Sequence, residues 1–162
     1  MPGTGGNPPP RITRLLEMGR LREQAFTREQ IGAVWLKAVE SARDAELADL
    51  SLDGALRAAY AAGHLAALAL LAAHGLRPGG GQGHHEAAFA GAAGLGHTQL
   101  EDLVPDSEEI RLLRKGSMYD PTVASPNDRD HALKWMRRTL PAIRAALLEA
   151  DERLQAGLAR YP

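Results

Sequence analysis

One stretch, residues 51–75, constrains the fold more than any other part of the chain. From Ala61 to Ala73 its only strongly polar side chain is His64. Apolar and small residues recur there at spacings of three and four, the period of an α-helix, at Leu52, Leu56, Ala59, Gly63, Ala66, Leu70 and Ala73. Further leucines widen the apolar surface, at Leu65, Leu68 and Leu71. The pattern predicts a buried central helix that neighbouring helices cover on more than one side.

Both ends of this stretch carry helix signals. Ser51 is a natural N-cap, and Gly75 suits the position just after the last turn, where a left-handed backbone is common. The apolar part from Ala61 to Ala73 would span only about 20 Å, whereas the hydrocarbon core of a bilayer is about 30 Å thick. A membrane span is therefore not expected, and the helix is assigned to a protein core.

The composition fits one helical domain. The chain has 162 residues, 44% of them hydrophobic, so we expect a single domain over residues 11–160. The first ten residues, MPGTGGNPPP, have no apolar pattern and are expected to be a disordered tail (1–10). Without cysteines or a signal-peptide pattern, a cytoplasmic protein is expected. Because the net charge is −1, any affinity for nucleic acid must come from a local basic patch.

Two helices are expected before the central one. Apolar residues indicate a short helix around residues 12–18. Thr27 and Gln30 have the spacing of a capping box, which starts a second helix that runs to about residue 47. The short connection to Ser51 predicts that this second helix packs against the central helix as an antiparallel hairpin.

Three helices are expected after the central one, and no alternating strand pattern is seen. The glycine-rich RPGGGQG is not expected to hold regular structure, and a weak Ala/Gly-rich helix follows at residues 84–94. The next helix opens near Pro105 and should end at Gly116. A last helix starts at Ser125 and should run to about residue 158, with a kink at Pro141.

Arg114 and Tyr119 form the most informative pair of polar residues. On a continuous helix five residues correspond to about 500°, so the two positions would lie about 140° apart. They can face one cleft only if the helix stops between them, which Gly116 would allow. The alternative is a helix whose last-turn cations complement its dipole, with Tyr119 packed as a half-buried anchor.

Three features together resemble the HEPN helix-bundle family of prokaryotic toxins and nucleotide-binding domains. They are the buried Ala/Leu-rich helix with Tyr60, the connection AHGLRPGGGQGHH, and the motif LLRKGSMYD. The likeness covers roughly residues 28–155 and implies an all-α, HEPN-like four- to five-helix up-and-down bundle. It also implies a homodimer that brings two copies of the motif together. Many members are metal-independent endoribonucleases of toxin–antitoxin type, and no cofactor is expected.

The resemblance assigns roles to the motif residues. Arg114 matches the family's arginine, Lys115 stands where asparagine is common, and Tyr119 occupies the position of a histidine or, in one toxin subgroup, a tyrosine. Arg114 and Tyr119 are then the catalytic residues, while Arg111 and Lys115 help to hold the phosphate.

Tyr119 is the point at which this sequence departs from the commoner histidine. A phenol with a pKa near 10 is a poor general base at neutral pH. Tyr119 could instead orient a 2′-hydroxyl or a phosphate, or be modified by a nucleotidyltransferase-type partner protein, as the tyrosine subgroup implies. The alternative function is a non-catalytic HEPN-like binding or scaffold module.

Several other polar residues are candidates for the rim of the same cleft. Arg57, Tyr60 and His64 share one face of the central helix, and His84 and His85 follow the glycine-rich connection. The favoured alternative is that Tyr60 and His64 are buried groups that are hydrogen-bonded within the bundle.

The remaining charged residues include two motifs with metal-like spacing and one basic run. Neither His84-His85-Glu86 nor Asp128-x-x-His131 completes a metal site, so no metal is expected. On the last helix Lys134, Arg137 and Arg138 form a basic run that is either a solvated face or a track for RNA.

Overall fold

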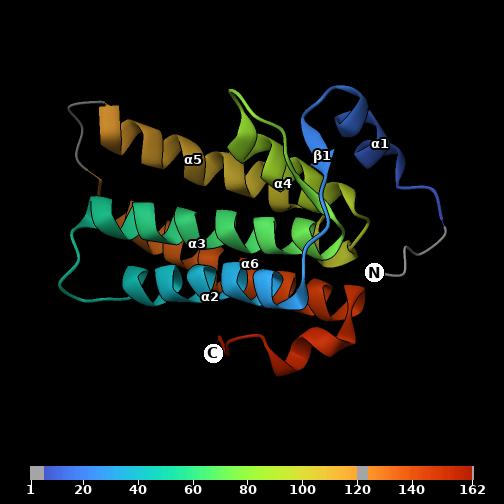
Figure 1. Cartoon of the computed structure of the whole chain (residues 1–162). Helices are drawn as coiled ribbons and strands as arrows, with labels where there is room; N and C mark the ends of the chain where they lie inside the picture. Colours follow the sequence, from blue (N-terminus) through green and yellow to red (C-terminus); the bar gives the residue numbers. More distant parts are fainter. Residues whose placement is uncertain (1–5, 120–123, 162) are drawn as a thin grey trace.

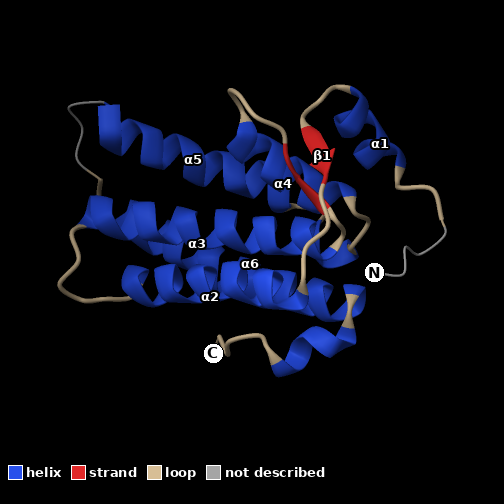
Figure 2. Cartoon of the chain, in the orientation of Figure 1, coloured by secondary structure: helices blue, strands red, loops and turns tan. Residues whose placement is uncertain are grey.

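The computed structural model describes residues 6–119 and 124–161, without the side chains of residues 117–119. These residues are mostly helical, as expected for an all-α fold, and include one small two-stranded sheet (Figure 1 and Figure 2). In chain order the elements are α1 (Pro10–Glu17), β1 (Leu21–Glu23), α2 (Arg28–Ala45), α3 (Leu52–Ala73), β2 (Leu76–Pro78), α4 (His84–Gly94), α5 (Leu103–Tyr119) and α6 (Pro126–Ala150), with 3₁₀ turns at Thr98–Leu100 and Glu152–Ala156.

Helix α3 is the central element, as the sequence predicts. Its first turn is capped by Ser51, whose Oγ accepts a hydrogen bond of 3.0 Å from the Gly54 N–H. At the other end Gly75 adopts a φ of +69° and donates its N–H to the carbonyl of Ala72. In Figure 1, α3 lies between α2 and α6 on one side and α4 and α5 on the other, and it contacts all four.

Burial of α3 explains its apolar composition. Among the described residues it is the one helix long and apolar enough to cross a membrane, yet 67% of its most apolar window is buried inside the protein. The core helix of a globular protein has the same properties. Its many alanines let the neighbouring helices approach closely, and at Gly63 even a methyl group has no room. A Cβ there would lie 2.8 Å from Cζ3 and 2.9 Å from Cζ2 of Trp135.

The helix starts predicted from capping residues are confirmed. Thr27 forms a capping box with Gln30 at the start of α2, and Ser125 forms one with Asp128 at the start of α6. Helix α6 contains Pro141 but ends at Ala150, not near residue 158. The prediction failed there because Asp151 adopts an extended backbone and its side chain caps a separate 3₁₀ turn.

The structure contains two short strands that no alternating pattern in the sequence indicated. β1 and β2 pair antiparallel, with Leu21 opposite Pro78 and Glu23 opposite Leu76. Each strand has three residues, too few to show a period-two pattern in the sequence. Part of the connection that was expected to lack regular structure therefore forms β2, and the pairing ties the segment after α1 to the connection between α3 and α4.

The expected end of α5 at Gly116 is also wrong. The helix begins at Leu103 and continues through Gly116 to Tyr119. A glycine inside a helix costs only about 1 kcal/mol relative to alanine, so it is a weak stop signal. Positions 114 and 119 consequently belong to one helix and lie about 140° apart around its axis. The side chain of Tyr119 lies outside the described residues, as do residues 1–5 of the expected tail.

Candidate functional site

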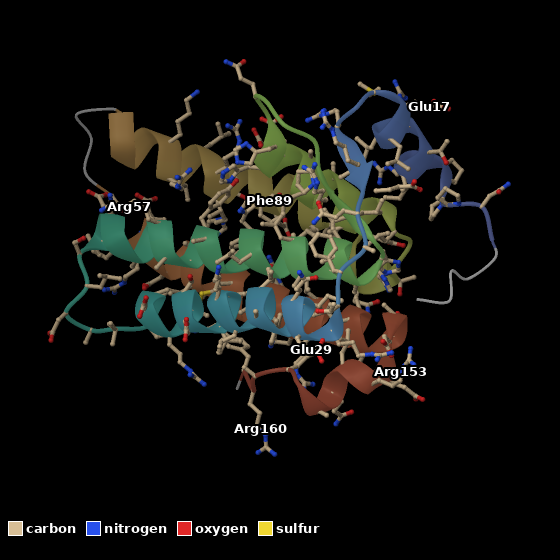
Figure 3. The ribbon with its side chains drawn as sticks, in the orientation of Figure 1. Glu17, Glu29, Arg57, Phe89, Arg153 and Arg160 are labelled. Atoms are coloured by element: carbon tan, nitrogen blue, oxygen red, sulfur yellow. The ribbon has the colours of Figure 1, made fainter. Side chains whose placement is uncertain are left out.

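A cavity of about 630 Å³ opens at the surface where α3, α4 and α5 meet. Figure 3 shows Phe89 of α4 inside the molecule near this junction, and its side chain is 3% exposed. The cavity is lined by one residue of α3, the loop and first turn of α4, and three cations of α5: Tyr60, Gly81, Gln82, Gly83, His84, His85, Glu86, Arg111, Arg114 and Lys115.

The cations come from one face of α5. Arg111, Arg114 and Lys115 are spaced by three and four residues, which places them side by side on the helix surface. Arg111 donates to both carboxylate oxygens of Glu108 at 2.8 and 2.7 Å, and these bonds raise its pKa further. The guanidinium of Arg114 lies 5.1 Å above the centre of the Tyr60 ring, a cation–π contact.

Arg114 and Lys115 are the cations that remain available to a ligand. Within the described part of the chain, neither forms an ion pair with a carboxylate, whereas Arg111 pairs with Glu108 and, at 3.5 Å, with Glu86. A cation at a cavity wall that has no carboxylate partner can bind a phosphate or another anion. The electrostatics of the cavity therefore favour a negatively charged ligand.

The N-terminus of α4 forms another part of the cavity wall. Its N-cap is Gly83, with a φ of +81°, and no side chain caps the first turn. Gly83, His84 and His85 line the cavity, so the positive end of the helix dipole lies beside it. A helix N-terminus and cations that line one cavity together suit a phosphate group.

His85 belongs to a stack of rings with His64 and Tyr60. The His85 ring lies parallel to the His64 ring of α3, with centroids 4.0 Å apart and an interplanar angle of 10°. Tyr60 is nearly parallel to His85 at 5.8 Å, and His84 is tilted by 59° from His85 at 4.3 Å. These contacts fix the plane of the His85 ring at the edge of the cavity.

Burial keeps the stacked imidazoles neutral. Desolvation lowers the pKa of His64 to about 3, and repulsion from His85 and His84 when they are protonated, and from Arg114, acts in the same direction. Desolvation also lowers the pKa of His85, again helped by His84 and Arg114. Tyr60 keeps its hydroxyl proton, because burial raises its pKa to about 12. At neutral pH the ring stack therefore carries no charge at His64, His85 or Tyr60.

Three polar atoms of this stack have no hydrogen-bond partner among the described residues. They are Tyr60 Oη, His64 Nε2 and His85 Nδ1, all buried. Leaving a buried polar group unpaired typically costs about 1 to 3 kcal/mol. The expectation that Tyr60 and His64 are buried is confirmed, but the hydrogen bonds expected of them within the bundle are not formed at these atoms. An unpaired polar group in a protein interior calls for an explanation such as an ordered water or a functional role.

The structure brings some of the predicted site residues together and separates others. Six of them line the cavity: Tyr60, His84, His85, Arg111, Arg114 and Lys115. His64 lies directly behind His85, whereas Arg57 is exposed near the start of α3, away from Phe89 in Figure 3, and is not part of the lining.

The two arginines expected to form an RNA track on α6 have carboxylate partners. Arg137 pairs with Glu46, donating from Nε at 2.6 Å, and Arg138 pairs with Asp106 at 3.2 Å. Neither arginine lines the cavity. They are therefore less available for phosphate than Arg114 and Lys115.

Sequence reasoning missed several residues of the lining. Gln82 and Glu86 lie there, and Glu86 pairs with both Arg111 and, at 3.7 Å, Arg20. Glu86 could have been predicted as a lining residue, because it follows His84 by two positions at the start of the same helix. No local pattern indicates that Arg20, from the segment before β1, reaches the same place.

The two metal-like motifs serve other purposes. Among residues 6–119 and 124–161, no group of three or more histidines and carboxylates is arranged to hold a metal ion. The side chain of Asp128 belongs to the capping box of α6, and His131 Nε2 lies 3.1 Å from Glu109.

Comparisons of the chain with protein-family models, curated proteins and solved structures found no match. The site is therefore interpreted from its own geometry and chemistry.

Proposed function

We propose that this protein binds a phosphate-bearing ligand, RNA or a nucleotide, in the cavity between α3, α4 and α5. One observation carries the proposal: Arg114 and Lys115 of α5, which have no carboxylate partner among the described residues, share the cavity with the uncapped N-terminus of α4. Both features attract an anion, and the anionic group of RNA and of nucleotides is phosphate.

The size and lining of the cavity support a ligand larger than a free phosphate ion. Its volume of about 630 Å³ lies in the range of small-molecule sites, roughly 300 to 1,000 Å³. The imidazoles of His84 and His85 offer ring faces and nitrogen atoms beside the cations, which suits the base and ribose of a nucleotide. A nucleotide, or one nucleotide of an RNA strand, would use both the cationic wall and the aromatic wall.

The resemblance to HEPN proteins adds a finer proposal. In this proposal the helices form a HEPN-like bundle, the chain acts as a homodimer in the cytoplasm, and a nucleotidyltransferase-type protein is its partner. Arg114 then holds the scissile phosphate of an RNA at a composite site, and the activity is metal-independent cleavage. The alternative remains a non-catalytic binding or scaffold module that uses the same cavity.

Salt-dependent RNA binding tests the proposal. Fluorescence anisotropy of a short labelled RNA is measured at several salt concentrations with the wild type, Arg114→Ala and Lys37→Ala. Lys37 is an exposed cation of α2, a helix that lies on the other side of α3 from α4 and α5 in Figure 1, and serves as the matched control. Each lost phosphate contact should reduce the slope of log affinity against log salt by about one unit.

We expect that reduction for Arg114→Ala and an unchanged slope for Lys37→Ala. Equal slopes for the two variants would show that RNA binds elsewhere. No measurable binding of RNA, or of a nucleotide used as a competitor, by the wild type would overturn the proposed function.

A further inference from the structure

The cavity contains two imidazoles that the expected catalytic pair, Arg114 and Tyr119, does not use. Resting on the proposed RNA binding, we propose that His85 and His84 transfer the protons in a metal-independent cleavage of RNA. His85 accepts the proton of the attacking 2′-hydroxyl, and His84 donates a proton to the leaving 5′-oxygen. The chemistry that a tyrosine at position 119 performs poorly is then supplied from the N-terminus of α4.

Both histidines line the cavity to which we assign the phosphate. They are consecutive residues of the α4 first turn, line the same cavity as Arg114 and Lys115, and have ring centroids 4.3 Å apart. Since Nδ1 of His85 is buried, Nε2 is assigned as the nitrogen that reacts. Two imidazoles beside one phosphate can serve the attacking and the leaving oxygen separately.

His64 positions His85 for this role. The two rings are stacked at 4.0 Å, within 10° of parallel, and His64 is itself 9% exposed. Because the buried His64 ring covers one face of the His85 ring, the His85 ring cannot tilt in that direction. The orientation of its ring nitrogens is therefore restricted. His64 does not line the cavity and therefore acts only through His85.

The charges around His85 suit a base that is neutral before the reaction. Burial lowers its pKa, followed by the effects of His84, Arg114 and Arg111. The groups that face it come from three helices: Tyr60 and His64 of α3, His84 and Glu86 of α4, and Arg111, Arg114 and Lys115 of α5. The cations disfavour a charged imidazole before RNA binds, and the phosphate of a bound RNA offsets part of their effect.

The proposed step balances without a metal or a redox partner. The 2′-oxygen forms a bond to phosphorus as the bond from phosphorus to the 5′-oxygen breaks. His85 gains the proton of the 2′-hydroxyl, and protonated His84 gives one proton to the 5′-oxygen. The products are a 2′,3′-cyclic phosphate and a 5′-hydroxyl. Arg114 and Lys115 stabilise the charge on the non-bridging oxygens, and exchange with solvent restores both histidines.

A cleavage assay in EDTA tests this assignment. The substrate is a labelled oligonucleotide, and the same molecule with 2′-deoxyribose throughout serves as the uncleavable ligand for binding measurements. The wild type is compared with His85→Gln, His84→Gln and His131→Gln, the last being an exposed histidine of α6 that pairs with Glu109 outside the cavity.

We expect His85→Gln and His84→Gln each to lower the cleavage rate by about 10²- to 10⁴-fold, the usual contribution of general acid–base catalysis. Affinity for the uncleavable ligand should fall far less than the cleavage rate, because Arg114 and Lys115 still hold the phosphate, and retained binding also shows that the variants are folded. The acidic limb of the rate–pH profile should disappear in His85→Gln, and His131→Gln should behave as the wild type.

The outcomes separate this inference from the proposed function. RNA that binds with the predicted salt dependence but is not cleaved by the wild type would overturn the histidine assignment and leave the proposed binding intact. Cleavage that survives in both His85→Gln and His84→Gln would also overturn it. If His85→Gln fails to fold, the exposed His84, whose replacement leaves the core untouched, decides the question through the rate of His84→Gln.

Discussion

Replacement of Gly63 by alanine tests the packing that positions the site. Inside an exposed helix this change normally stabilises a protein by about 1 kcal/mol, because alanine has the better helix propensity. In α3 the added methyl group would meet the indole of Trp135, at 2.8 Å from Cζ3 and 2.9 Å from Cζ2. Carbon atoms pack best at about 3.5 to 4.0 Å, so either the indole or the helix must move.

The steric cost should exceed the gain in propensity. Overpacking of a dense core typically costs about 1 to 3 kcal/mol, and both partners here are buried. Taking the upper end of that range for contact with a rigid ring, we expect Gly63→Ala to destabilise the protein by about 1 to 2 kcal/mol. For a chain of this size that corresponds to a melting temperature lower by about 2 to 8 °C.

Chemical denaturation of four proteins gives a decisive test. The wild type, Gly63→Ala, Trp135→Phe and the double variant form a cycle in which the shorter phenyl ring removes the clashing atoms. The loss caused by Gly63→Ala should shrink to about 0.5 kcal/mol or become a gain in the Trp135→Phe background. An equal loss in both backgrounds, or a wild-type background stabilised by Gly63→Ala, would refute the packing argument.

Three further predictions concern charge, chemistry and assembly. Because the pKa of His64 is about 3 in the folded protein and near 6.5 when unfolded, the unfolded state binds more protons between these values, so stability should fall as pH decreases from 6.5 toward 3. His64→Gln should flatten that fall, measured by urea denaturation across this range, and an unchanged profile would argue against a buried neutral imidazole. Because positions 114 and 119 lie about 140° apart around α5, Tyr119→Phe should reduce cleavage by no more than about 13-fold, the upper value of one hydrogen bond, and a loss above about 100-fold would instead assign proton transfer to Tyr119. Sedimentation at micromolar protein should reveal a dimer, whereas a monomer at all concentrations would eliminate the composite site.

The parts of the fold that could be predicted depend on local chemistry. Ser51 and Gly75 mark the ends of α3 because capping and a left-handed residue act within one turn. The capping box at Thr27 acts over the same range. Gly116 misled the prediction, because a glycine stops a helix only when its neighbours favour another conformation, and α5 continues through it. Pairing of β1 with β2 joins residues more than fifty positions apart, which no local pattern encodes.

Some residues of the candidate site could likewise be grouped from local sequence, whereas others could not. Arg111, Arg114 and Lys115 could be grouped from the sequence because they share one helix face. That His84 and His85 line the same cavity depends on how α4 packs on α3 and α5, and the sequence pattern suggested only a common rim. The stack of His85 on His64, and the unpaired Tyr60 hydroxyl, follow from packing between helices and required the structure.

Histidine NMR during ligand titration tests the central claim most directly. The chain has six histidines, and single His→Gln variants assign their imidazole signals. On addition of a 2′-deoxy oligonucleotide, which cannot be cleaved, the signals of His84 and His85 should shift with a shared saturation curve. Those of His97 and His131, which lie outside the cavity lining, should stay in place. Shifts at His97 or His131 with none at His84 and His85 would contradict a phosphate-binding cavity at the N-terminus of α4.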